Sequence, residues 1–243
     1  VWQASSEIIP LIIYENLSLV LQTPESRGME NPVAVPLERS PVLRFVFRVD
    51  LRLRPFGDNG PLVMSFDGLE SYYQEQGRDW ERYAWIKARA VAGDRSAGEE
   101  LLRRLQPFVY RRYLDFGAFE SLRAMKLMIT QEVARKGLER NIKLGPGGIR
   151  EVEFFGQIFQ LIRGGVTPDL QERGIRRVLA VLAERGTISE ETRCELDAAY
   201  VFLRNVEHRL QEAGDQQTHD LPREAAGMAR LAAAMGFDRS EER

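Results

Sequence analysis

The stretch "RFVFRVDLRLRP", residues 44 to 55, alternates apolar and charged side chains with a period of two. The charged positions of its second half are Arg48, Asp50, Arg52 and Arg54. This period predicts a β-strand with one apolar face and one charged face. Pro55 cannot donate to a β-ladder and turn-forming residues follow it, so the strand is expected to end there. Such a face is usually solvated and carries cross-strand ion pairs, which gives Asp50 a purely structural interpretation.

The composition limits the classes of function. The chain has 243 residues, enough for one large or two modest domains. Its 34 basic and 36 acidic residues nearly cancel, which gives no argument for non-specific binding to nucleic acid or to an anionic membrane surface. Cys194 is the only cysteine, which excludes an internal disulfide framework and a zinc cluster and fits a reducing compartment. We therefore expect a cytoplasmic protein that binds neither nucleic acid nor membrane.

The last two thirds of the chain show apolar residues at spacings of three and four, which predict helices. The predicted helices are residues 67–76, 79–92, 97–113, 116–136, 148–163, 174–185 and 190–213. Residues 22–42 contain four prolines and one glycine, which predict a loop or linker. The fold class expected from the pattern is α+β and mostly α, with a helical bundle after the charged strand.

Three charged residues fall on the predicted apolar faces of these helices. Lys87 lies between Trp80 and Val91, and Glu151 and Glu207 lie in similar positions in two later helices. An unpaired charge buried there would cost several kcal/mol, so at least two of the three are expected to be paired in a polar network. Structural alternatives stay open: Lys87 can extend its ammonium to solvent, and Glu151 can complement a helix N-terminus.

A glycine-rich segment, "KLGPGGIREVEF", precedes the predicted helix 148–163. Gly145, Gly147 and Gly148 stand directly before the helix and Lys143 lies two residues further upstream. Exposed amides at such a helix start can hold an anion, and a lysine nearby adds positive charge. The segment is a weak motif for a phosphate site when taken alone.

Several longer segments, in order along the chain, resemble one enzyme family. They are "FVFRVDLRLRPFGDNGPLVMSF", "YYQEQGRDWERYAWIKARAVAGD", "FVYRRYLDFGAFESLRAMK", "NIKLGPGGIREVEFFGQIFQLIRGG", "AYVFLRNVEHRLQ" and "DQQTHDLP". From about Phe45 onward the chain resembles the bifunctional glutamine synthetase adenylyltransferase/adenylyl-removing enzymes, and "DWERYAWIKAR" is similar to their N-terminal, adenylyl-removing half. Residues 1–43 show no such resemblance.

The resemblance implies a fold, domains and a reaction. Residues 44–94 would be part of a palm domain of the polymerase-beta nucleotidyltransferase type, and residues 95–243 a helical domain. The family reaction is a Mg²⁺-dependent phosphorolysis, in which phosphate removes AMP from a tyrosine of glutamine synthetase and releases ADP. The implied partners are glutamine synthetase, a P-II signalling protein, ATP, ADP and phosphate.

The resemblance also implies roles for the charged residues. Asp50 would be a catalytic carboxylate and a Mg²⁺ ligand, since carboxylates are natural ligands of this ion, with Arg52 and Arg54 facing phosphate oxygens. Lys87, Lys143, Gly145, Gly147 and Gly148 would bind nucleotide or phosphate. Glu151 and Glu207 would form the polar network.

One departure from the family pattern matters. Family members have an Asp-x-Asp pair upstream of the charged strand that supplies the first two metal ligands, and residues 1–44 contain none. One carboxylate cannot build a two-metal site. We therefore expect a piece of the enzyme, inactive alone. The alternative is a non-catalytic interaction module that binds glutamine synthetase or a P-II protein. A uridylyltransferase-like relative fits the quoted motifs less well.

Overall fold

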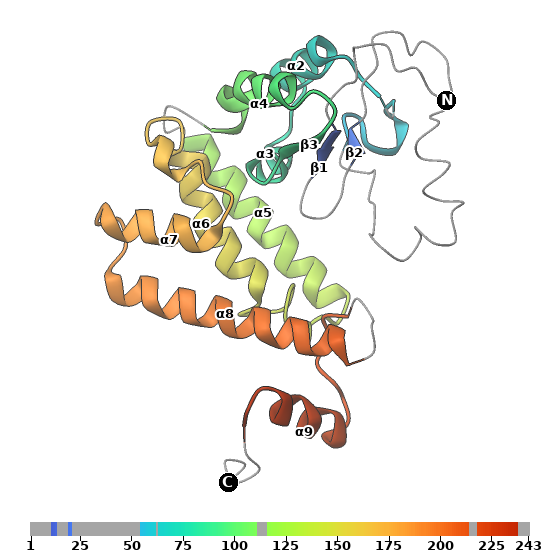
Figure 1. Ribbon diagram of the computed structural model, residues 1–243, viewed down its shortest axis with the longest axis vertical. Helices are drawn as coiled ribbons and strands as arrows, with labels where there is room; N and C mark the ends of the chain where they lie inside the picture. The colour runs from blue at the N-terminus through green and yellow to red at the C-terminus, as the bar shows by residue number, and fades with distance from the viewer. Residues whose placement is uncertain are drawn as a thin grey trace. The chain divides into compact units, whose positions relative to one another are not determined.

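The computed structural model describes residues 11–13, 19–20, 54–61, 63–110, 116–213 and 218–237, a few of them by their backbone alone. The chain divides into two compact units, residues 1–113 and residues 114–243 (Figure 1). The charged strand predicted around Asp50 lies outside the described residues, except for Arg54.

In its described part, the first unit combines a small sheet with three α-helices and one short 3-10 helix. The elements are β1 (Leu11–Ile13), β2 (Leu19–Val20), η2 (Gly57–Asn59), α2 (Phe66–Glu75), α3 (Asp79–Ile86), β3 (Arg89–Ala92) and α4 (Arg95–Val109). The strand order is β2-β1-β3, and both pairings are antiparallel. Helix α4 packs against α2, α3 and β3. Its own sequence explains its start, because the Asp94 carboxylate accepts hydrogen bonds from the amides of Ser96 and Ala97.

The core of the first unit is apolar and aromatic. Leu69, Leu101 and Leu105 are almost fully buried, one on α2 and two on α4. The rings of Tyr73 and Trp85 meet edge to face, with centroids 5.2 Å apart. These contacts join α2, α3 and α4 around one core.

The helix predicted over residues 79–92 is shorter in the structure. Helix α3 ends at Ile86, Lys87 is its C-cap, and residues 89–92 form β3. Trp80, which the prediction placed on the buried stripe, is 40% exposed, whereas Trp85 and Ile86 are buried. The prediction was wrong because "RAVA" obtains its backbone partners from β1, a contact that helical periodicity cannot reveal.

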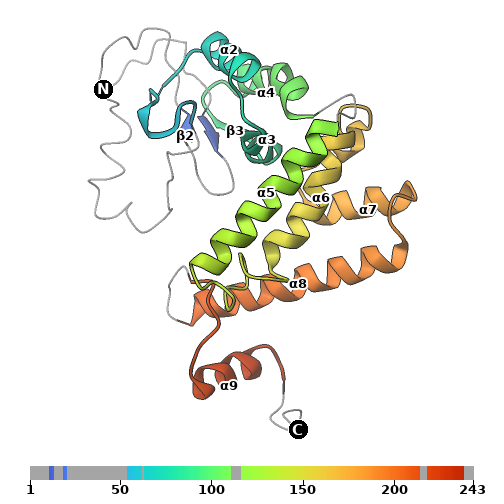
Figure 2. The same ribbon diagram turned by 180° about the vertical axis from the view of Figure 1, so that it is seen from behind.

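The second unit is all helical apart from one bridge, in the part of it that the structure describes. Its elements are α5 (Phe116–Arg135), α6 (Ile149–Arg163), η3 (Pro168–Leu170), α7 (Ile175–Glu184), α8 (Glu190–Glu212) and α9 (Ala225–Ala234). Helices α5 and α6 lie side by side in both views (Figures 1 and 2). Helices α6, α7 and α8 pack against one another, and α9 packs on α8. Helix α9 was not predicted from the sequence.

Two apolar clusters hold the second unit together. The larger one joins α6, α7 and η3 around Val178, Leu179 and Leu182, with Tyr200 of α8 packed on it. The smaller one joins Val206 and Leu210 of α8 with Ile142 and, at its edge, Leu231 of α9. The long helix α8 therefore contributes to both clusters.

The observed architecture agrees with a mostly helical α+β fold. The nucleotidyltransferase palm remains a prediction, because most of the strand that would define it lies outside the described residues. The sequence placed a boundary between residues 94 and 95, whereas α4 belongs by its packing to the first unit. Among the described helices none is both long and apolar enough to cross a bilayer.

Candidate functional site

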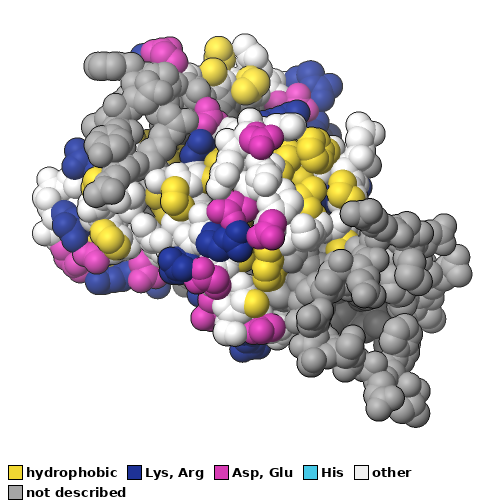
Figure 3. Space-filling view, turned by 90° about the horizontal axis from the view of Figure 1, so that it is seen from above, with side chains coloured by type: hydrophobic (Ala, Val, Ile, Leu, Met, Phe, Trp, Pro, Cys, Tyr) yellow, Lys and Arg dark blue, Asp and Glu magenta, His cyan; other side chains and the backbone are white. Residues whose placement is uncertain are grey.

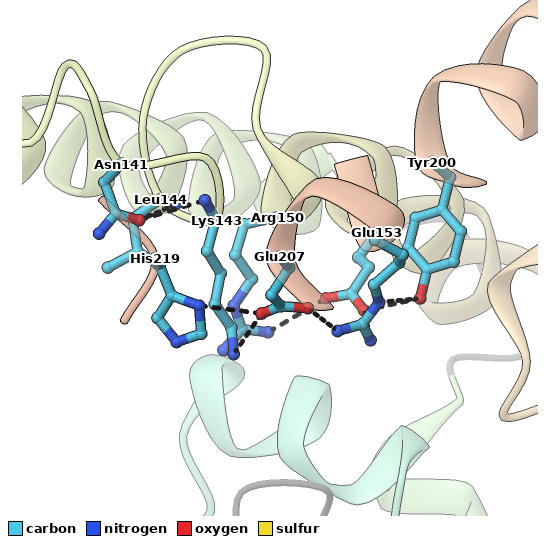
Figure 4. A network of polar contacts seen from close by, with 9 residues as sticks. Asn141, Lys143, Leu144, Arg150, Glu153, Tyr200, Glu207 and His219 are labelled. Atoms are coloured by element: carbon cyan, nitrogen blue, oxygen red, sulfur yellow. Dashed lines mark hydrogen bonds and ion pairs between the residues drawn. The ribbon is translucent and has the colours of Figure 1, made fainter. Parts of the chain in front are cut away.

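The polar cluster with the most buried charge in the second unit is built around Glu207 of α8 (Figure 4). We call it the Glu207 cluster, and its members are Lys143, Arg150, Glu153, Tyr200, Arg204, Glu207 and His219. They come from the glycine-rich segment, from the first turns of α6, from α8 and from the residues before α9. These segments are far apart in the sequence, and the fold brings them together.

Glu207 lies at the centre of this cluster. Its side chain is 3% exposed, and its Oε2 accepts a hydrogen bond of 2.7 Å from Arg204 Nη1. Its Oε1 lies 3.7 Å from Lys143 Nζ and 2.9 Å from His219 Nδ1. Burial works to raise the pKa of Glu207, but the hydrogen bond from Arg204 and the charges of Arg204 and Lys143 outweigh it, and the pKa is lowered. Glu207 is therefore a carboxylate at neutral pH.

His219 faces Glu207 without an aligned hydrogen bond. Although the two atoms are 2.9 Å apart, Glu207 Oε1 and His219 Nδ1 are both buried and neither has a hydrogen-bond partner of acceptable geometry. Burial and the charge of Lys143 lower the pKa of His219. The imidazole is consequently neutral at pH 7, and the positive charges next to Glu207 are those of Arg204 and Lys143.

A second buried carboxylate, Glu153 of α6, shares Arg204 with Glu207. Arg204 Nη2 lies 3.6 Å from Glu153 Oε1, and Arg150 Nη1 lies 3.7 Å from Glu153 Oε2. The Tyr200 hydroxyl accepts a 3.1 Å hydrogen bond from Arg204 Nε. Two buried carboxylates are thus surrounded by three partly exposed cations, Arg150, Arg204 and Lys143, whose side chains are 46%, 31% and 21% exposed.

The glycine-rich segment is fixed by its own backbone and by Asn141. The Asn141 Oδ1 accepts hydrogen bonds from the amides of Lys143 (3.1 Å) and Leu144 (2.9 Å), while its Nδ2 donates to Asp220 Oδ1 (2.8 Å). A Cβ on Gly145 would lie 2.6 Å from the Asn141 carbonyl oxygen. Close backbone packing explains this glycine without a ligand.

The glycine amides are not free to hold an external anion. The amide of Gly145 donates to the Asn141 carbonyl (2.7 Å), and that of Gly148 donates to the Gly145 carbonyl (3.0 Å). The amide of Gly147 donates to Glu151 Oε2 at 3.0 Å. The predicted amide-based anion site is therefore corrected: the anion at this helix start is the Glu151 carboxylate. The prediction that Lys143 binds phosphate does not depend on these amides.

Glu151 lies on the exposed side of α6, contrary to the prediction. Its side chain is 43% exposed and forms an ion pair with Lys126 of α5, which lowers the pKa of Glu151. The buried polar residues of α6 are instead Glu153, Gln157 and Gln160. Gln160 is buried because its amide donates at 2.6 Å to the carbonyls of both Leu170 and Glu172 and so fixes η3 against α6.

The other predicted site residues belong to the first unit. Asp50 and Arg52 are outside the described residues. Arg54 donates from Nε to the Gly60 carbonyl (3.1 Å), and Lys87 caps α3. Of the three charges predicted on apolar faces, Glu151 and Glu207 are each paired, as expected. They do not share one network, because Glu151 pairs with Lys126 at an exposed position and Glu207 pairs with Arg204 and Lys143.

Sequence reasoning missed five members of the site: Arg150, Glu153, Tyr200, Arg204 and His219. The spacing of Arg204 and Glu207, three apart on one helix, was available as a signal for an ion pair. Nothing in the spacing of His219 indicated that it meets Glu207. Within the described residues, no group of three or more His, Cys, Asp or Glu side chains could hold a metal ion.

The chain matches two family models. The model described as glutamate-ammonia ligase adenylyltransferase matches residues 35–104, and the model described as GlnD PII-uridylyltransferase matches residues 123–243. Together they define a nucleotidyltransferase-related protein with a distinct helical part.

Curated relatives carry the name bifunctional glutamine synthetase adenylyltransferase/adenylyl-removing enzyme. That of Nitrosococcus oceani is 68% identical over 193 residues, which are 79% of this chain and 20% of the relative. That of Thioalkalivibrio sulfidiphilus is 62% identical over 194 residues, which are 80% of this chain and 20% of the relative. That of Hahella chejuensis is 58% identical over 193 residues, which are 79% of this chain and 20% of the relative. The chain belongs to the family of these enzymes and spans about a fifth of their length.

Proposed function

We propose that this chain is a segment of a glutamine synthetase adenylyltransferase/adenylyl-removing enzyme that takes part in phosphorolytic removal of AMP from a tyrosine of glutamine synthetase. The observation that carries the proposal is the identity of 58% to 68% with relatives named for both activities. Residues 44–94 would contribute to the nucleotidyltransferase domain, and the residues after them would form its helical partner domain, with helix α4 packed as part of the first unit. P-II protein and ATP are proposed partners, and the cytoplasm is the proposed location.

The charged strand is the proposed catalytic part. Asp50 would bind Mg²⁺, which in such reactions neutralises charge on the transferring group, and Arg52 and Arg54 would face phosphate oxygens. Further carboxylate ligands would have to come from outside the residues described here. Lys87, which caps α3, is the proposed nucleotide-binding lysine of the first unit.

The Glu207 cluster is the proposed phosphate-facing part of the helical domain. Its buried carboxylates hold the cations in place, so Lys143 and Arg150 present positive charge without first losing side-chain freedom. Three cations against two carboxylates leave an excess of positive charge at the partly exposed edge. Over the face drawn in Figure 3, by contrast, described basic and acidic side chains are interspersed.

The proposal is tested in a hybrid enzyme. The matched 193-residue segment replaces its counterpart in the Nitrosococcus oceani relative, and ADP formation from adenylylated glutamine synthetase, Mg²⁺ and phosphate is measured. We expect activity in the hybrid, its loss in Asp50→Asn, and a raised KM for phosphate in Lys143→Met. Lys136→Met, which removes an exposed lysine paired with Glu132, is the matched control. A folded hybrid in which Asp50→Asn keeps full activity would contradict the proposal.

The isolated 243-residue chain is expected to form no ADP under the same conditions, because its sequence lacks the Asp-x-Asp pair. ADP formation that disappears in Asp50→Asn would overturn this expectation. The same absence favours the second candidate function, a non-catalytic module that binds glutamine synthetase or a P-II protein. An inactive hybrid, together with binding of the isolated chain to glutamine synthetase without Mg²⁺, would favour that candidate.

A further inference from the structure

A cavity of about 370 Å³ lies between the C-terminal part of α8 and helix α9. Its volume is within the range of small-molecule sites, roughly 300–1,000 Å³. The lining residues are Arg209, Leu210, Ala213, Pro222, Arg223, Glu224, Gly227, Arg230, Leu231 and Ala234. No member of the Glu207 cluster is among them, so the cavity is separate from the proposed phosphate-facing edge.

The walls of the cavity are held by specific contacts. The Arg140 guanidinium donates to the Pro222 carbonyl (2.7 Å), and the Leu221 amide donates to the Arg140 carbonyl (3.0 Å). Leu231 packs on the apolar cluster that contains Leu210. A Cβ on Gly227 would lie 2.7 Å from Pro222 Cβ, so glycine allows α9 to approach this segment. The cavity is consequently a built feature of the packing between α8 and α9.

The lining combines apolar side chains with an excess of positive charge. Leu210, Pro222 and Leu231 provide apolar surface, while three arginines and only one acidic residue, Glu224, line the same cavity. Arg209 is paired with Glu212 at 2.7 Å. Arg223 and Arg230 are both exposed and form no ion pair within the part of the chain that the structure describes. Guanidinium groups bind carboxylate and phosphate through paired hydrogen bonds.

We propose that this cavity binds a small organic anion. An apolar body would lie against Leu210, Pro222 and Leu231, and a carboxylate or phosphate would face Arg223 and Arg230. Such a ligand would join α8 to α9, since its two parts contact both helices.

The experiment measures binding to the 243-residue chain by two-dimensional NMR of its backbone amides. The probes are phenyl phosphate and benzoate, which carry an anion on an apolar ring, and phenol and inorganic phosphate, which each lack one of these parts. We expect shifts in α9 with a dissociation constant in the millimolar range or below for phenyl phosphate, benzoate or both. Which of the two binds more tightly distinguishes a phosphate ligand from a carboxylate ligand.

Variants test the two halves of the site. Arg230→Gln and Arg223→Gln should each weaken binding about tenfold, which corresponds to loss of one charge-assisted contact of roughly 1.4 kcal/mol. Ala234→Phe should abolish binding by filling the cavity. Arg177→Gln, which removes an exposed arginine of α7, is the matched control and should bind like the unaltered chain.

Four outcomes would overturn the proposal. The first is that neither aromatic anion binds. The second and third are that phenol, or inorganic phosphate, binds as tightly as the better of the two aromatic anions. The fourth is that both arginine variants bind this anion as tightly as the unaltered chain. Circular dichroism of each variant shows whether α9 and the fold are intact.

Discussion

Glu81 of α3 and Glu207 of α8 are equally buried, each 3% exposed, but their pKa values shift in opposite directions. Burial raises the pKa of Glu81, and the opposing hydrogen bonds from the Arg78 amide (2.7 Å) and the Tyr72 hydroxyl (3.0 Å), together with the charge of Arg78, do not cancel this effect. Burial also acts on Glu207, but the hydrogen bond and charge of Arg204, aided by Lys143, leave its pKa lowered.

The difference shows what each carboxyl group does. Glu81 completes the capping of α3 with neutral donors and has no guanidinium or ammonium group bonded to it among the contacts described. Glu207 orders a group of cations at the surface of its unit. The charge of the partners, rather than the depth of burial, decides the sign of the pKa shift.

The largest effect on stability is expected for Glu207→Ala. The substitution leaves Arg204 and Lys143 facing each other without their shared carboxylate, and removing one partner of a buried pair costs about 3–5 kcal/mol. Because 31% of the Arg204 side chain is exposed, we expect the lower end, about 3 kcal/mol. Urea unfolding followed by circular dichroism measures it. The double variant with Arg204→Met should lose less than the sum of the single losses, and strict additivity would contradict the account.

A smaller loss in the free energy of unfolding, about 1 kcal/mol, is expected for Glu81→Gln. The neutral amide keeps one acceptor oxygen but turns an NH₂ group toward the donors of Arg78 or Tyr72. Tryptophan fluorescence measures this loss, since Trp80 and Trp85 belong to the same unit as Glu81. Tyr72→Phe is the companion variant and should cost a similar amount. A loss as large as that of Glu207→Ala would remove the distinction between the two carboxyl groups.

The smallest effect is expected for Glu151→Ala, below about 1 kcal/mol, because ion pairs between exposed groups contribute little. Glu151 and Lys126 are 43% and 40% exposed. Raising the salt concentration should shrink the difference further. A loss of several kcal/mol would restore the sequence-based view of Glu151 as a buried charge.

Much of the helical architecture could be predicted from the sequence, because helices α5 to α8 each carry a sustained apolar period. The apolar period failed to predict burial where a polar side chain bonds to a distant backbone segment or pairs with a distant side chain. Gln160 is 1% exposed because it binds two carbonyls near η3, and Glu153 is buried because Arg150 and Arg204 reach it. Neither contact is visible in the spacing of residues along one helix.

The candidate site was predictable only in part. Glu207 stood out as a charge among leucines and is indeed buried and paired, and Lys143 was named and lies beside it. His219 approaches Glu207 because the Asn141–Asp220 bridge brings residues 218–220 to the glycine-rich segment. A pairing between segments nearly eighty residues apart leaves no local pattern in the sequence.

The most direct test of the central claim is the pH dependence of stability in Glu81→Gln and Glu207→Gln. A lowered folded-state pKa means that the contribution of Glu207 is lost as the pH falls from its ordinary value of 4.5. A raised folded-state pKa means that the contribution of Glu81 is lost as the pH rises above 4.5. The stability difference between the unaltered chain and each variant, measured by urea unfolding, should therefore rise with pH below 4.5 for Glu207→Gln and fall with pH above 4.5 for Glu81→Gln. Differences that change with the same sign in both variants would contradict the account.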